Sequence, residues 1–131
     1  MFATGKVCGA EAVSAGEETL HVKPVDLKHL RRYTLGDKGL EREVMQLFLA
    51  QIPKTIGALR DAVDEHEWRI AAHTIKGSAR AIGAWQIARL AEQAERMAGT
   101  KNRANQLAII DRIEDSIVDA KGFIVETYGA L

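Results

Sequence analysis

The sequence predicts an all-α fold: an antiparallel up-down four-helix bundle with a short extra N-terminal helix. Apolar residues recur at three- and four-residue steps along most of the chain, and no convincing stretch alternates with the period of two that is typical of strands. Glycine, proline and polar turns divide this helical pattern into segments. The four bundle helices are expected at about 37–65, 67–81, 84–98 and 103–128, and a helix at about 24–34 should cover one end.

The composition indicates one domain without a broad charge preference. The chain has 131 residues, with 18 basic and 18 acidic side chains, so its formal net charge is zero. This balance provides no electrostatic basis for binding nucleic acid or an anionic membrane. The single cysteine, Cys8, excludes an intrachain disulfide and fits a reducing compartment. Without an apolar run long enough to span a bilayer or a signal-peptide pattern, we expect a cytoplasmic protein.

The N-terminal segment, residues 1–23, is expected to be a flexible tail. It is rich in Ala, Gly, Ser, Thr and Glu and shows neither the helical nor the strand period. The bundle domain is therefore assigned to 24–131. Pro24 suits the first position of the short helix, because its fixed φ is compatible with a helix start. Leu35-Gly36-Asp37 should end that helix and cap the next one.

The helix expected at about 37–65 contains a proline. Pro53 should kink it or divide it into two nearly collinear helices, because proline cannot donate a hydrogen bond to the preceding turn. The residues expected on its apolar stripe are Leu40, Val44, Leu47, Phe48, Ile56, Leu59 and Val63, with Met45 on the flank. The polar residues 64–67 then separate this helix from the next.

The segment Ala71–Gly83 carries the candidate functional site. Its predicted buried stripe consists of Trp68, Ala71, Ala72, Ile75, Ala79 and Ile82. His73 lies about 150° from the middle of that stripe and should face solvent. Lys76, Gly77 and Arg80 follow at helical offsets that place them on the same outer face as His73. Gly83 should end the helix.

The residue types on this face suit the transfer of a phosphoryl group. An exposed imidazole is a nucleophile near neutral pH, and a phosphoryl group on it brings close to two negative charges, which Lys76 is placed to offset. Gly77 costs about 1 kcal/mol relative to alanine in a helix, which is understandable if a partner must approach the backbone. Taken singly, these residues also fit solvated charges or a glycine that allows tight helix packing.

The motif resembles a known family. His73-Thr74-Ile75-Lys76-Gly77-Ser78-Ala79 is similar to the H-x-L-K-G-S/A-A signature of histidine-containing phosphotransfer (HPt) domains, with Ile75 where the family usually has leucine. Ile82-Gly83-Ala84 resembles the turn that follows the active-site helix in that family. Upstream, the similar residues are Phe48-Leu49, Pro53 and Leu59-x-x-Ala62. The resemblance extends over about Val25 to Tyr128.

The resemblance implies a step in a multistep two-component phosphorelay. His73 would accept a phosphoryl group from the phospho-aspartate of a receiver domain and pass it to another receiver. Lys76 and Arg80 would stabilise the phosphate, while Gly77 and Ile70 would provide clearance and a docking rim. The chain would be a phosphocarrier rather than an enzyme, with no cofactor of its own and Mg²⁺ on the partner. The implied partners are receiver domains of response regulators or hybrid histidine kinases, and we expect a monomer.

The two remaining helices place a carboxylate near His73. The turn at Gly83 makes the following helix antiparallel, so Glu95, twelve residues after the turn, reaches the height of His73, ten residues before it. The resemblance implies that Glu95 hydrogen-bonds and orients the ring. A solvated glutamate is the alternative, and Glu92 is a weaker candidate. The stripe expected on the last helix consists of Leu107, Ile110, Ile113, Ile117, Val118, Phe123 and Ile124.

Other functions stay open at this point. A helical adaptor would bind receiver domains without carrying phosphate, although the combination of His73 and Lys76 disfavours it. An enzyme that uses His73 as a general base would lack a visible nucleophile and a glycine-rich phosphate loop. His66 would lie about two turns from His73 on a continuous helix, which is too far for a shared metal ion, so no metal site is expected.

Overall fold

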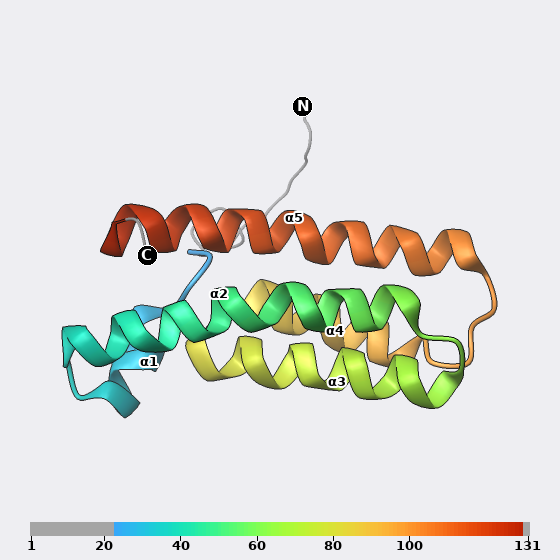
Figure 1. Ribbon diagram of the computed structural model, residues 1–131, viewed down its shortest axis with the longest axis horizontal. Helices are drawn as coiled ribbons and strands as arrows, with labels where there is room; N and C mark the ends of the chain where they lie inside the picture. The colour runs from blue at the N-terminus through green and yellow to red at the C-terminus, as the bar shows by residue number, and fades with distance from the viewer. Residues whose placement is uncertain (1–22, 130–131) are drawn as a thin grey trace, which may run out of the picture.

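The computed structural model describes residues 23–129, and this part contains helices and turns but no strand (Figure 1). The helices are α1 (Leu27–Thr34), α2 (Lys38–Asp61), α3 (Glu65–Ile82), α4 (Trp85–Arg96) and α5 (Arg103–Tyr128). Helices α2 to α5 run alternately up and down, and α1 packs against α2 and α3 at one end. The predicted all-α bundle is therefore confirmed. The expected tail, including Cys8, lies outside the described residues except for Lys23.

Helix α1 begins one residue after Asp26, so the predicted start at Pro24 is wrong. The Asp26 carboxylate caps the helix by accepting a hydrogen bond from the backbone N–H of His29 (3.1 Å). The other Asp26 oxygen accepts from Trp85 Nε1 (3.0 Å), and the Asp26 N–H donates to the carbonyl of Gly83 (2.9 Å). Asp26 therefore fastens the start of α1 to the turn between α3 and α4.

Gly83 ends α3, and both its backbone conformation and its close approach to Asp26 favour glycine. Its φ of +77° lies in the left-handed region, and its N–H closes the helix by donating to Ala79 and Arg80 carbonyls. A Cβ at this position would lie 2.7 Å from the Asp26 carbonyl oxygen. The turn that makes α3 and α4 neighbours therefore depends on a residue without a side chain.

Helix α2 continues through Pro53, whose ring lies on the exposed side, and it ends at Asp61 rather than near residue 65. The predicted stripe is partly wrong, because Leu40, Leu47 and Val63 are exposed. The residues that α2 buries are Glu41, Met45, Phe48, Ile52, Ile56 and Leu59. The buried face includes the charged residue Glu41, which hydrophobic periodicity does not place in a core. Val63 is exposed because it follows the helix end.

Helix α5 has the predicted bounds but a somewhat different buried face. Leu107 and Val118 are exposed, contrary to the prediction. The residues that α5 buries are Ile109, Ile110, Ile113, Ala120 and Ile124. They pack into a core to which all five helices contribute. In the described part of the chain, the helices are too short or too polar to span a lipid bilayer.

A buried carboxylate joins α1, α2 and the end of α5. Glu41 is fully buried and accepts hydrogen bonds from Arg31 Nε (2.9 Å), Tyr128 Oη (3.0 Å) and Thr34 Oγ1 (3.4 Å). Burial alone would raise the pKa of Glu41, but the hydrogen bonds from Arg31 and Tyr128 outweigh it and hold this pKa below its usual value. Burial and the contact with Glu41 raise the pKa of Tyr128 to about 12.

This network predicts an acid-dependent contribution to stability. The pKa of Glu41 is lower in the folded state, so its ionisation favours folding above about pH 5, and this contribution is lost as the pH falls through the folded-state pKa. Glu41→Gln should lower the free energy of unfolding by about 1–3 kcal/mol at pH 7 and by less below about pH 4. Urea unfolding at both pH values measures this. Glu43→Gln, at an exposed position of α2, is the control. A loss that does not depend on pH would contradict the role of the charge.

The α3–α4 turn generates a second prediction. Gly83→Ala should destabilise the fold by about 2–4 kcal/mol, because alanine is strained at positive φ and its Cβ would collide with the Asp26 backbone. Gly122→Ala should stabilise by about 1 kcal/mol, because a Cβ in that helical position meets nothing within 4 Å. Thermal unfolding followed by circular dichroism compares the two variants. Equal effects at the two glycines would show that the turn geometry is unimportant.

Candidate functional site

Helix α3 presents His73 to solvent because its apolar residues occupy the opposite side. The side chains that α3 buries are Trp68, Ala71, Ala72, Ile75, Ala79 and Ile82. The imidazole of His73 is 67% exposed. Asp64 caps the start of the helix by accepting from the N–H of Glu67 (2.8 Å). The position of His73 on α3 therefore follows from a well-defined buried face and a capped first turn.

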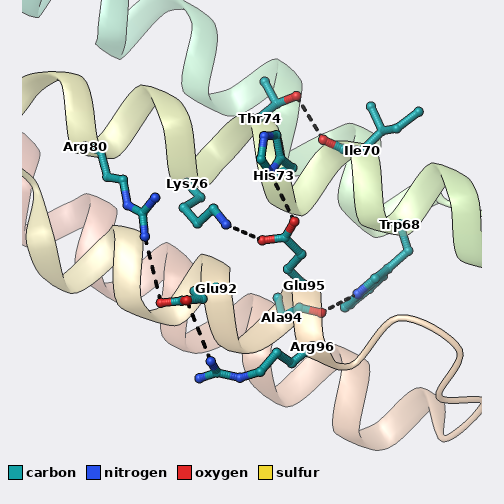
Figure 2. A network of polar contacts seen from close by, with 10 residues as sticks. All are labelled: Trp68, Ile70, His73, Thr74, Lys76, Arg80, Glu92, Ala94, Glu95 and Arg96. Atoms are coloured by element: carbon teal, nitrogen blue, oxygen red, sulfur yellow. Dashed lines mark hydrogen bonds and ion pairs between the residues drawn. The ribbon is translucent and has the colours of Figure 1, made fainter.

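The register between α3 and α4 is set by close packing and one buried hydrogen bond. Trp68 Nε1 donates to the carbonyl oxygen of Ala94 (2.6 Å), one residue before Glu95 (Figure 2). Both helices bury alanines, whose small side chains allow neighbouring backbones to approach closely. These are Ala71, Ala72, Ala79, Ala88, Ala91 and Ala94. The pairing brings α4 side chains beside those of α3.

The carboxylate of Glu95 contacts both His73 and Lys76 (Figure 2). Glu95 Oε2 lies 3.0 Å from His73 Nδ1, and Glu95 Oε1 lies 2.6 Å from Lys76 Nζ. The side chains of Glu95 and Lys76 are only 22% and 14% exposed, so the ion pair is shielded from water. The sequence predicted that Glu95 lies level with His73 along the helix pair, but it did not predict that Lys76 would contact the same carboxylate.

The ionisation of Glu95 determines which nitrogen of the His73 imidazole carries the hydrogen. The hydrogen bond from Lys76 lowers the pKa of Glu95, burial opposes this, and the hydrogen bond with His73 adds to the lowering. An ionised carboxylate only accepts hydrogen bonds, so the contact requires Nδ1 to donate. The outer nitrogen, Nε2, is then left with a free lone pair when the ring is neutral. This arrangement suits nucleophilic attack from Nε2.

Arg80 lies on the same face but is directed at a different carboxylate. Arg80 Nη2 is 4.0 Å from Glu92 Oε1, and Arg96 Nη1 is 3.7 Å from Glu92 Oε2 (Figure 2). Glu92 therefore pairs with two arginines, whereas the carboxylate in contact with the His73 ring is that of Glu95. Both arginines are more than half exposed, so their charges remain accessible to an approaching molecule.

Gly77 and Ile70 flank His73 along α3. A Cβ built on Gly77 would meet no heavy atom within 4 Å, so tight helix packing does not explain this glycine. Ile70 is 53% exposed and, with Thr74, lines a groove between α2 and α3. Leu47 and Ser78 line a second groove between the same two helices. The sequence analysis assigned Leu47 to the buried stripe of α2, but the stripe runs through Met45, Phe48 and Ile52 and leaves Leu47 on the surface.

The described residues include no cluster suited to a metal ion. Among residues 23–129, no group of three or more His, Cys, Asp or Glu side chains could hold one. His66 lies in the first turn of α3, seven residues before His73. The groups gathered at the site are the His73 imidazole, the Glu95 carboxylate and the cations of Lys76 and Arg80.

Comparison with known proteins identifies the family. The family model for the Hpt domain matches residues 43–122, which is more than half of the chain and includes Ile70, His73, Lys76 and Glu95. A search of curated proteins and a search of solved structures each find no match. The helical bundle and the extent of the match agree: the chain belongs to the Hpt domain family, the phosphotransfer domains of phosphorelays.

Proposed function

We propose that this chain is a histidine phosphotransfer protein of a multistep two-component phosphorelay. In this proposal, His73 accepts a phosphoryl group from the phospho-aspartate of one receiver domain and passes it to another. The observation that supports it best is the hydrogen bond between His73 Nδ1 and Glu95, because it leaves Nε2 as the exposed nucleophile. The family match supports the same reading.

The proposed transfer is a direct exchange between two side chains. The lone pair of His73 Nε2 attacks phosphorus, the P–O bond to the receiver aspartate breaks, and the carboxylate leaves with the electron pair. Phosphoryl transfer depends mainly on in-line positioning and charge neutralisation. The chain supplies the nucleophile, and the receiver domain is expected to supply Mg²⁺ and the remaining catalytic groups. The chain therefore acts as a phosphocarrier rather than as an enzyme.

The neighbouring residues have separate proposed roles. Lys76, one turn after His73 and paired with Glu95 in the structure, places a cation beside the incoming phosphoryl oxygens. Arg80 provides a second, more exposed cation farther along α3. Gly77 leaves room for the partner above the helix backbone, and Ile70 gives the partner an apolar contact. These roles are consistent with docking over the exposed face of α3.

The first prediction concerns the phosphorylated residue. Receiver domains from the source genome, phosphorylated with acetyl phosphate, should transfer an acid-labile, base-stable label to the wild-type chain. His73→Gln should lose this label entirely and keep its helical circular dichroism spectrum, because the side chain is exposed. His66→Gln is the matched control and should retain the label. A labelled His73→Gln variant would refute the assignment, and wild-type chain that binds receivers without gaining label would indicate an adaptor.

The second prediction separates docking from folding at Gly77. Gly77→Leu should raise helix stability by about 1 kcal/mol, because leucine is a better helix former and the site is open. The same variant should slow transfer from a phosphorylated receiver by between about tenfold and a hundredfold, because the new side chain displaces the partner from its productive position. Thermal unfolding and rapid-quench labelling measure the two effects. Transfer at the wild-type rate would exclude a clearance role.

A further inference from the structure

The carboxylate of Glu95 faces Nδ1 of His73, and this contact can persist after the ring is phosphorylated. If the phosphoryl group is on Nε2, as the proposed function requires, the ring carries phosphorus on one nitrogen and hydrogen on the other. Nδ1–H still faces Glu95 Oε2, which lies 3.0 Å away in the structure. An anion this close favours the protonated form of a ring nitrogen. Glu95 is therefore positioned to act on the phosphorylated ring.

We infer that Glu95 keeps the proton on Nδ1 of phosphorylated His73, that this proton keeps the phosphoryl group transferable, and that Lys76 limits the effect by sharing the carboxylate. The inference rests on the proposed function and concerns how that site is regulated by pH. Glu95 is a positioning residue here, because it acts through the imidazole and does not touch the phosphoryl group.

The importance of the proton follows from the leaving group. In onward transfer, the P–Nε2 bond breaks, its electron pair stays on Nε2, and a P–O bond forms to the acceptor. With a hydrogen on Nδ1, the group that leaves is neutral imidazole, and Nδ1 keeps its proton throughout. Without that hydrogen, the leaving group would be an imidazolate anion, which is a far stronger base and leaves far more slowly. The phosphorylated ring should therefore be reactive only while Nδ1 is protonated.

Lys76 and Glu95 should influence this proton in opposite directions. Lys76 Nζ lies 2.6 Å from Glu95 Oε1 and is largely shielded from solvent, so it partly neutralises the carboxylate that faces the ring. Removing the Lys76 charge leaves the full negative charge of Glu95 for Nδ1. Removing the Glu95 charge leaves a cation near the ring without its counter-ion. A purely structural role for the pair would not produce opposite shifts.

Other charged groups face this part of α3 from the elements packed against it. On α4, Glu92 pairs with Arg80 and Arg96. The groove between α2 and α3 beside Ile70 and Thr74 has charged lining residues, namely Lys54, Asp61 and Glu67. Helix α1 meets the Gly83 end of α3, ten residues or about 15 Å from His73. Among these groups, Glu95 is the carboxylate that hydrogen-bonds the ring.

The test needs no receiver domain. Potassium phosphoramidate phosphorylates histidine directly, and ³¹P NMR follows both the pH titration of the phosphohistidine signal and its hydrolysis to inorganic phosphate. In hydrolysis, water attacks phosphorus and the same P–Nε2 bond breaks. The signal of His73 is assigned by its absence from His73→Gln, and phosphohistidine elsewhere in the chain provides an internal reference. The variants are Glu95→Gln, which keeps an acceptor oxygen, and Lys76→Met, which keeps the aliphatic stem.

The expected result is a pair of opposite shifts. Glu95→Gln should lower the pH midpoint of the ³¹P titration and of the hydrolysis rate by about one to two units, and Lys76→Met should raise both midpoints. Unchanged midpoints, or shifts in the same direction, would overturn the inference. The proposed function fails separately, if the phosphorylated chain passes its phosphoryl group to no receiver.

Discussion

The site depends on the antiparallel pairing of α3 and α4 in one register. Gly83 fixes one end of the pair, because its left-handed turn is closed against the Asp26 backbone. The hydrogen bond from Trp68 to Ala94 fixes the other end, one residue before Glu95. With both ends held, Glu95 and His73 meet across the interface without a mobile loop between them. Sites built on packed helices keep their geometry better than sites on loops.

The rest of the bundle supports this pair from one end. Helix α1 is held to the α3–α4 turn through Asp26 and to α2 through the ion pair between Arg31 and the buried Glu41. Tyr128 extends that contact to α5 by donating to the same carboxylate. Arg42 adds a hydrogen bond to the Tyr128 carbonyl. The short helix therefore links the turn beneath the site to the two longest helices.

Much of the fold could be predicted from the sequence, because helical periodicity is clear wherever the buried face is purely apolar. On α3, the stripe from Trp68 to Ile82 is apolar throughout, so the outward direction of His73 followed. On α2, the buried face includes Glu41, and its partner Tyr128 lies 87 residues away in sequence. No local pattern carries that information, so the phase was misjudged and Leu47 was assigned to the core. The height of Glu95 followed from the turn length, but its bond to Lys76 depends on side-chain reach.

That bond changes how the charge balance at the site should be understood. Before phosphorylation, Lys76 and Glu95 compensate each other, so the imidazole lies beside a nearly neutral pair. A phosphoryl group adds close to two negative charges, and it competes with Glu95 for Lys76. If the proposed function holds, Lys76 neutralises Glu95 less as its ammonium group moves toward the phosphoryl oxygens. More of the negative charge of Glu95 then acts on Nδ1–H of His73. The position of Lys76 thus determines how much of the Glu95 charge acts on the proton that the phosphoryl group needs in order to leave.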